Sequence, residues 1–169
     1  MDNMQFQDIF PEEKYEFDVK KCNQVFVYGT LKTGGEIRGL NSMGLNVTPQ
    51  GKAKTSYPDY HMIDLGAGFP GLLKGKNQVI GEVWQVDAEA LYVIDGMEGF
   101  DREEFDWEKE EPIPNFGNAD DGSFYTRTII DTSEGRAWVY FLPEAKYGKY
   151  RDLESDKIEM VDNTVIWHN

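Results

Sequence analysis

Cysteine and histidine are scarce in this chain of 169 residues, which has one cysteine, Cys22, and two histidines, His61 and His168. A single cysteine excludes an intrachain disulfide framework. Two histidines and one thiol also leave too few nitrogen and sulfur ligands for a zinc centre. We therefore expect no disulfide and no metal site.

Basic residues are few relative to acids. The 17 Lys and Arg against 31 Asp and Glu give a formal net charge of −14. Nucleic-acid binding requires cations that neutralise phosphates, and a polybasic membrane anchor requires clustered Lys or Arg, so the sequence predicts neither partner. The hydrophobic content of 40%, with 14% aromatic residues, is sufficient for a core, so the acidity does not indicate disorder.

Long apolar runs are missing as well. No stretch of about 18 apolar residues occurs, so no transmembrane helix is expected. The first six residues, MDNMQF, have neither the basic nor the apolar region of a signal peptide. The sequence therefore predicts a soluble, cytoplasmic protein, and its length fits one domain.

The chain contains a series of short strand-like segments between turns. Residues 1–21 are polar and acidic and include a helix-interrupting Pro11, so we expect a peripheral N-terminal extension, followed by a single domain at residues 22–169. Apolar and alternating runs predict strands at 24–28, within 51–64, at 78–86, at 124–130 and at 137–142, with a hairpin link at 131–135.

One short helix is predicted after the strand at 78–86. Asp87 can cap its N-terminus, and the glycines at 96 and 99 stand where it should end. Its buried stripe is predicted from helical spacing as Leu91, Ile94 and Met97.

Residues 101–121 form an acidic insertion. They hold nine acids against two bases, a net charge of −7, and their prolines indicate irregular structure. Further on, the apolar residues 165–167 are expected to dock on the core. The order of elements predicts an α+β fold, a small mixed, mostly antiparallel β-barrel with helices on its outside.

Two features could carry chemistry. In the loop Tyr28-Gly29-Thr30-Leu31, the glycine lets backbone N–H groups form a nest for a carboxylate or an oxyanion, although an ordinary turn is the commoner alternative. Glu98 stands at the predicted C-terminal end of the helix, where the dipole disfavours a second negative charge. Burial there would raise its pKa, as a proton shuttle requires, whereas the alternative is a surface acid at a helix end.

The combined segments resemble one known family. In order along the chain they are VFVYGTLK at 25–32, FPGL at 69–72, IGEVWQV at 80–86, Leu91 with IDGMEG at 94–99, YTR at 125–127 and AWVY at 137–140. Their order and spacing are similar to those of the γ-glutamylcyclotransferase-like, or AIG2-like, family. The resemblance spans about residues 24–142.

This resemblance implies a small β-barrel flanked by helices. It also implies an enzyme that cyclises a γ-glutamyl amine or peptide to 5-oxoproline and releases the free amine, with a small-molecule substrate and no cofactor or metal. Carried over residue by residue, the catalytic general acid/base is Glu98. The substrate-binding residues are then Tyr28, Gly29, Thr30, Leu31 and Tyr125.

The sequence departs from the family at two places. It has the N-terminal extension, and residues 100–124 place 25 residues between Gly99 and Tyr125, where family members have a short link. Two alternatives therefore stay open. One is a non-catalytic protein that binds a small ligand in the same pocket, and the other is an interaction module whose acidic insertion docks on a basic partner. The leaving amine and the oligomeric state are not determined by the sequence.

Overall fold

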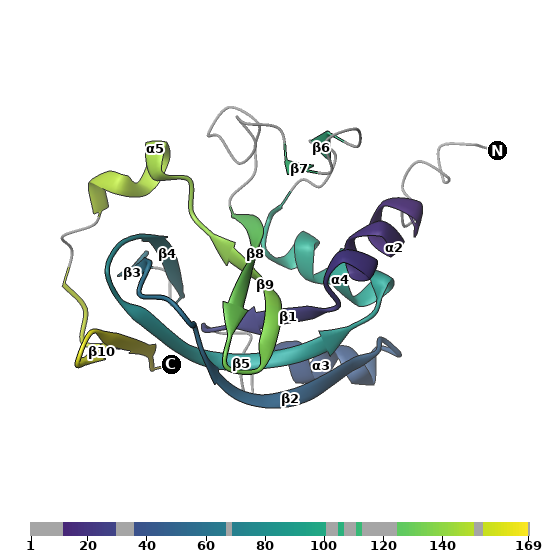
Figure 1. Cartoon of the computed structure of the whole chain (residues 1–169), viewed down its shortest axis with the longest axis horizontal. Helices are drawn as coiled ribbons and strands as arrows, with labels where there is room; N and C mark the ends of the chain where they lie inside the picture. Colours follow the sequence, from purple (N-terminus) through teal and green to yellow (C-terminus); the bar gives the residue numbers. More distant parts are fainter. Residues whose placement is uncertain are drawn as a thin grey trace.

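The computed structural model describes residues 12–29, 36–66, 69–100, 105–106, 111–112, 125–150 and 154–168 (Figure 1). Its helices are α2 (Glu12–Lys21), α3 (Glu36–Ser42), α4 (Ala88–Met97), α5 (Glu144–Tyr147) and a 3₁₀ helix, η2 (Gly148–Tyr150). Its strands are β1 (Gln24–Val27), β2 (Val47–Lys54), β3 (Tyr60–Asp64), β4 (Pro70–Lys74), β5 (Gln78–Val86), β6 (Phe105–Asp106), β7 (Glu111–Pro112), β8 (Thr126–Thr132), β9 (Gly135–Phe141), β10 (Ile158–Val161) and β11 (Thr164–Trp167).

Seven of these strands form the central sheet, in the order β10-β11-β5-β1-β9-β8, with β2 paired to the other edge of β5. The pairs β1–β5, β2–β5, β8–β9 and β10–β11 are antiparallel, whereas β1–β9 and β11–β5 are parallel. The predicted α+β class with a mostly antiparallel sheet is therefore confirmed.

The sheet curls so that the end of β2 meets β8. Thr55 and Thr132 form an isolated antiparallel bridge. Beside it, the amide of Ser133 donates to the carbonyl of Lys54 at 2.9 Å. Among the described residues these corner contacts, rather than a continuous ladder, join the two strands, so the sheet approaches a barrel without closing fully.

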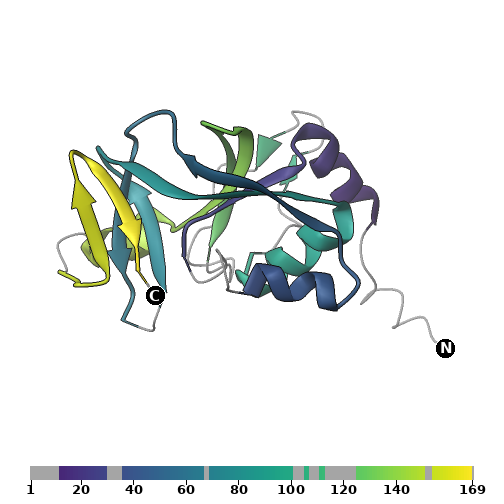
Figure 2. The ribbon, with the colours of Figure 1, turned by 90° about the horizontal axis from the view of Figure 1, so that it is seen from below.

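The strands present two cores, because successive side chains point to opposite faces. We call the first the helix-side core; it includes Val25, Val27, Trp84, Trp138 and Tyr140 of the sheet with Leu91 and Ile94 of α4. We call the second the hairpin-side core; it includes Phe26, Val83, Val139, Val165 and Trp167 together with Met62 and Leu72 of the β3–β4 hairpin. Figure 2 shows the helices α2, α3 and α4 gathered at one end of the molecule and the hairpin β10–β11 at the other.

Helix α4 begins as the sequence predicts. The side chain of Asp87 accepts a hydrogen bond from the amide of Ala90 at 2.9 Å, as an N-cap should. The predicted stripe is correct for Leu91 and Ile94, which are fully buried, but wrong for Met97, which is 41% exposed. Asp95 is buried in its place, because it faces a buried arginine described below.

The expected peripheral extension at residues 1–21 needs correction over the part that the structure describes. Residues 12–21 are helix α2, which packs beside α4 (Figure 1). Tyr15 and Asp18 are 2% and 1% exposed, respectively, because they pair with partners in the core. Residues 1–11 lie outside the described residues.

Strand β5 has the predicted bounds, and the predicted hairpin is formed by β8 and β9, with each strand starting two residues from its expected position. The apolar tail docks as expected, since β11 pairs with β5 and Trp167 is fully buried.

Of the acidic insertion at 101–121, the structure describes β6 and β7, which pair antiparallel. Within the described part of the chain, none of the helices is long and apolar enough to span a bilayer.

Candidate active site

Glu98 is the C-terminal cap of α4 and is partly buried. Its amide donates to the carbonyl of Ile94 at 2.9 Å. Gly99 follows with φ of +66°, a left-handed conformation that favours glycine at a helix end. The amide of Phe100 then donates back to the carbonyl of Asp95 at 2.9 Å. These bonds fix the backbone that presents the Glu98 carboxyl group.

The charge of Glu98 raises the pKa of three buried tyrosines, Tyr28, Tyr125 and Tyr140. Burial raises the pKa of Tyr28 well above its ordinary value of 10, and the charges of Tyr125 and Glu98 raise it further. Burial followed by the charge of Glu98 likewise raises the pKa of Tyr125. Tyr140 has a raised pKa mainly through burial and Asp95, with a smaller contribution from Glu98. The hydroxyls therefore stay protonated, and each has one proton to donate in a hydrogen bond.

The backbone also holds these tyrosines together. The hydroxyl of Tyr28 donates to the carbonyl of Tyr140 at 2.6 Å, and the hydroxyl of Tyr125 donates to the carbonyl of Pro70 at 2.5 Å. Gly29 packs against Pro70 so closely that a Cβ atom would lie 2.8 Å from its Cδ. A side chain at position 29 would therefore push apart the loop after β1 and the start of β4.

The structure thus brings four of the sequence-predicted residues into one region: Tyr28, Gly29, Glu98 and Tyr125. The other two, Thr30 and Leu31, lie outside the described residues. The backbone nest expected at residues 29–31 is therefore a prediction that the structure leaves untested.

Sequence reasoning missed a buried ion cluster beneath the end of α4. Arg127 of β8 is 3% exposed and donates from Nε and Nη2 to the two carboxylate oxygens of Asp95, at 2.8 and 2.9 Å. Its Nη2 also donates to Asp18 of α2 at 2.7 Å. The hydroxyls of Tyr15 and Tyr140 donate to the same Asp95 carboxylate, the former at 2.7 Å. Asp95 thus accepts hydrogen bonds from three elements besides its own.

The guanidinium group of Arg127 is held as a cation. Burial alone would lower its pKa, but the carboxylate of Asp95 outweighs burial, so that the pKa is raised overall. The group also lies 4.3 Å from the ring centre of Trp138 and 4.9 Å from that of Phe100, within cation–π range. One signal could have located the cluster, because Asp95 stands four residues after Leu91 and so shares its buried helix face.

The remaining candidate chemistry is limited. Within the described ranges, no group of three or more His, Cys, Asp or Glu side chains could hold a metal ion. Cys22 is buried, burial raises the pKa of its thiol, and the thiol donates to the carbonyl of Arg136 at 3.4 Å. It is therefore a core residue, since reactive cysteines have depressed pKa values.

Comparison with known sequences identifies one family. Residues 25–161 match the family described as gamma-glutamyl cyclotransferase, AIG2-like. A protein of Vibrio cholerae named "Putative gamma-glutamylcyclotransferase" is 33% identical over 120 residues, which cover 71% of this chain and 82% of that protein. The gamma-glutamylcyclotransferase family protein ytfP of Citrobacter rodentium is 27% identical over 117 residues, 69% of this chain and 79% of that one.

Solved structures show the same fold. A mouse AIG2-like protein superposes with a TM-score of 0.57 at 23% identity, covering 78% of this chain and 84% of that one. The c4763 protein of uropathogenic E. coli superposes with a TM-score of 0.50 at 16% identity, covering 76% of this chain and 85% of that one.

Proposed function

Because the chain belongs to the gamma-glutamyl cyclotransferase, AIG2-like family, we propose that it cyclises a small γ-glutamyl amine or γ-glutamyl peptide. The products are 5-oxoproline and the free amine. The observation that carries this proposal is the position of Glu98 at the end of α4, where its charge acts on the hydroxyls of Tyr28 and Tyr125.

The reaction is an intramolecular acyl transfer. The substrate's α-amine attacks its own γ-carbonyl carbon, and the bond from that carbon to the leaving nitrogen breaks. An α-ammonium group loses two protons in becoming the lactam N–H, and the leaving nitrogen gains two in becoming an ammonium ion. No oxidation state changes, so the proposal includes no cofactor. Because both reacting groups belong to one molecule, the protein's main task is to hold them in attack geometry and to move protons.

Glu98 is the proposed proton carrier. As a carboxylate it accepts a proton from the α-ammonium group or the attacking amine, and as a carboxylic acid it donates a proton to the departing amine. Its position at the C-terminal cap of α4, partly buried beside the buried tyrosines, is where this two-way role would be performed.

The loop after β1 is the proposed substrate-binding segment. Backbone N–H groups at Gly29, Thr30 and Leu31 would hold the α-carboxylate or stabilise the oxyanion. In this proposal Tyr28 and Tyr125 line the same region. Their hydroxyl protons are donated to the carbonyls of Tyr140 and Pro70, so toward the substrate their oxygens act as hydrogen-bond acceptors.

Measurement of 5-oxoproline release from a panel of γ-glutamyl compounds tests the proposal. The wild-type protein, Glu98→Gln and the control Glu89→Gln are compared, because Glu89 is an exposed glutamate on the same helix. We expect release by the wild type and the control, and loss of about 10²-fold or more in kcat for Glu98→Gln. The best substrate of the panel then identifies the leaving amine.

Two outcomes contradict the proposal. Full activity of Glu98→Gln would remove this residue from the proton transfer. Silence of the wild type across the panel would favour the alternative of a non-catalytic protein that binds a small ligand in the same pocket.

A further inference from the structure

We infer that helix α2 is a positioning element that holds the C-terminal turn of α4, and with it Glu98, in place through Tyr15 and Asp18. The catalytic consequence of this inference rests on the proposed function. Helix α2 precedes the family-matched residues 25–161, so the family pattern does not assign it a role.

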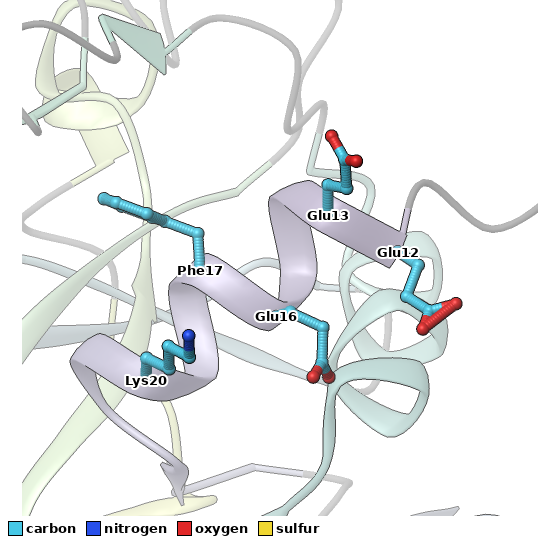
Figure 3. A pocket seen from close by; sticks show the side chains of 5 residues that line it. All are labelled: Glu12, Glu13, Glu16, Phe17 and Lys20. Carbon is cyan, nitrogen blue, oxygen red and sulfur yellow. The ribbon is translucent and has the colours of Figure 1, made fainter.

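The two sides of α2 differ in chemistry. Its outward side carries three glutamates and a lysine, which with Phe17 line an open hollow of about 490 Å³ (Figure 3). The four predicted active-site residues that the structure describes do not line this hollow. Its inward side carries Tyr15 and Asp18, 2% and 1% exposed. A carboxylate is buried this deeply only when it is paired with a donor or a cation. The inward side of α2 is therefore the side that contacts the rest of the protein.

Both inward side chains bind the Arg127–Asp95 pair. Asp18 accepts from Nη2 of Arg127 at 2.7 Å, and Tyr15 donates to Oδ2 of Asp95 at 2.7 Å. The Arg127–Asp95 pair joins β8 to α4. The two hydrogen bonds from α2 connect a third element to this pair. Such a pair holds its geometry best when every donor and acceptor is satisfied.

Asp95 transmits this constraint to Glu98. It lies three residues before Glu98, nearly one turn of the helix. Its carbonyl accepts the amide of Phe100 at 2.9 Å, so both the side chain and the backbone of Asp95 fix the chain on either side of Glu98. Its carboxylate also accepts the hydroxyl of Tyr140, whose carbonyl accepts the hydroxyl of Tyr28. A shift of Asp95 would therefore move the proposed proton carrier and one proposed substrate contact together.

Two variants test the inference against one control. Asp18→Asn keeps the shape of the side chain and removes its charge, and Tyr15→Phe removes a single hydroxyl in case Asp18→Asn does not fold. Glu16→Gln makes the same kind of carboxylate-to-amide change on the exposed side of the same helix.

Amide hydrogen-exchange rates measure how firmly the C-terminal end of α4 is held, and they require no assay of activity. In Asp18→Asn we expect the amides of Glu98 and Phe100 to exchange at least about tenfold faster than in the wild type. The amide of Leu91, bonded to the carbonyl of Asp87 at 3.0 Å in the first turn, is the internal control and should not change. Tyr15→Phe should give a smaller change in the same direction, and Glu16→Gln none.

Kinetics then measure the catalytic consequence. Misplacement of a reacting group by about 1 Å can cost about 10²-fold, so kcat for 5-oxoproline release should fall by about 10- to 100-fold in Asp18→Asn. KM should change less than kcat, by less than about threefold, because the shift reaches Tyr28 through Tyr140 but leaves the backbone groups proposed at residues 29–31 in place. A loss of stability alone would lower the melting temperature and leave both constants unchanged in the folded protein.

The outcomes separate this inference from the proposed function. Unchanged exchange at Glu98 and Phe100 in both variants overturns the inference, as does unchanged kcat in an active protein. A wild type that releases no 5-oxoproline overturns the proposed function instead, and the exchange rates then still determine whether α2 holds the end of α4.

Discussion

The helix-side core and the hairpin-side core are built on the same strands but differ in chemistry. All three fully buried charged side chains among the described residues, Asp18, Asp95 and Arg127, contact the helix-side core. Beside the apolar residues of the hairpin-side core, such as Phe26 and Val83, the buried polar group of Thr55 is neutral and accepts a hydrogen bond from the amide of Val79 at 3.0 Å.

This difference reflects which elements pack on each face of the sheet and how they are attached. The β3–β4 hairpin covers its side of the sheet mainly through the apolar contacts of Met62 and Leu72, which are non-directional. The helices α2 and α4 are instead joined to β8 by directional bonds between charged groups, which fix orientation as well as distance. The candidate proton carrier is on the side with the directional bonds.

The largest expected effect comes from removing the cation of the helix-side core. Arg127→Met should lower the free energy of unfolding by about 3–5 kcal/mol, because it leaves two carboxylates buried without their partner. Urea denaturation measures this loss. Arg136→Met, at an exposed arginine of β9, is the matched control and should cost less than about 0.5 kcal/mol. Equal losses of unfolding free energy in the two variants would show that the buried cation does not stabilise the helix-side core.

The reverse change introduces a hydroxyl into the hairpin-side core. Val139→Thr keeps the shape of a fully buried side chain but should lower the free energy of unfolding by about 1–3 kcal/mol, because the hydroxyl is removed from water. Val161→Thr is the control on an exposed strand position, 59% exposed, and should be nearly neutral. A neutral Val139→Thr would show that this core accepts polar groups as readily as the other.

Tyr28, of the hairpin-side core, is predicted to make stability fall at alkaline pH. Burial holds its pKa in the folded protein well above the ordinary value of 10, so above pH 10 the unfolded chain loses a proton that the folded chain keeps. Stability from this residue is thus complete below pH 10 and falls by about 1.4 kcal/mol per pH unit above it. In Tyr28→Phe the fall in unfolding free energy between pH 10 and 11, measured by urea denaturation, should be smaller by about 1 kcal/mol, because the tyrosine of the unfolded chain is only partly ionised at the lower end of this interval. Identical slopes would contradict the assignment.

The smallest effect concerns the N-terminal end of α4. Asp87→Ala should cost about 1 kcal/mol, because it removes the cap bond to Ala90. Glu89→Ala, in the same helical turn without a cap role, should cost only a few tenths of that. Thermal denaturation compares the two. A cost as large as that of Arg127→Met would mean that α4 is held mainly at its first turn rather than by the ion pair.

Much of the fold and part of the candidate site could be predicted from sequence patterns. The alternation of β5, the Asp87 cap and the glycine after Glu98 are signals within a few residues, and each predicted its element correctly. The motifs around Tyr28, Glu98 and Tyr125 also predicted the family that the comparisons identify.

The remainder depended on contacts between distant parts of the chain. The pattern of residues 12–21 is polar, so nothing local indicates burial of Asp18. Its burial follows from Arg127, which is 109 residues away, and the burial of Asp95 follows from the same arginine, 32 residues away.

The sequence by itself determined strand β5, the hairpin of β8 and β9 and the capped helix α4, because backbone periodicity and capping act over a few residues. The choice of Glu98 as the candidate carboxylate rested on the resemblance to the family. Only the tertiary structure decided that α2 belongs to the core and that Asp95, rather than Met97, faces inward. A charged side chain is buried only where an opposite charge and sufficient hydrogen bonds meet it, and folding alone brings those groups together.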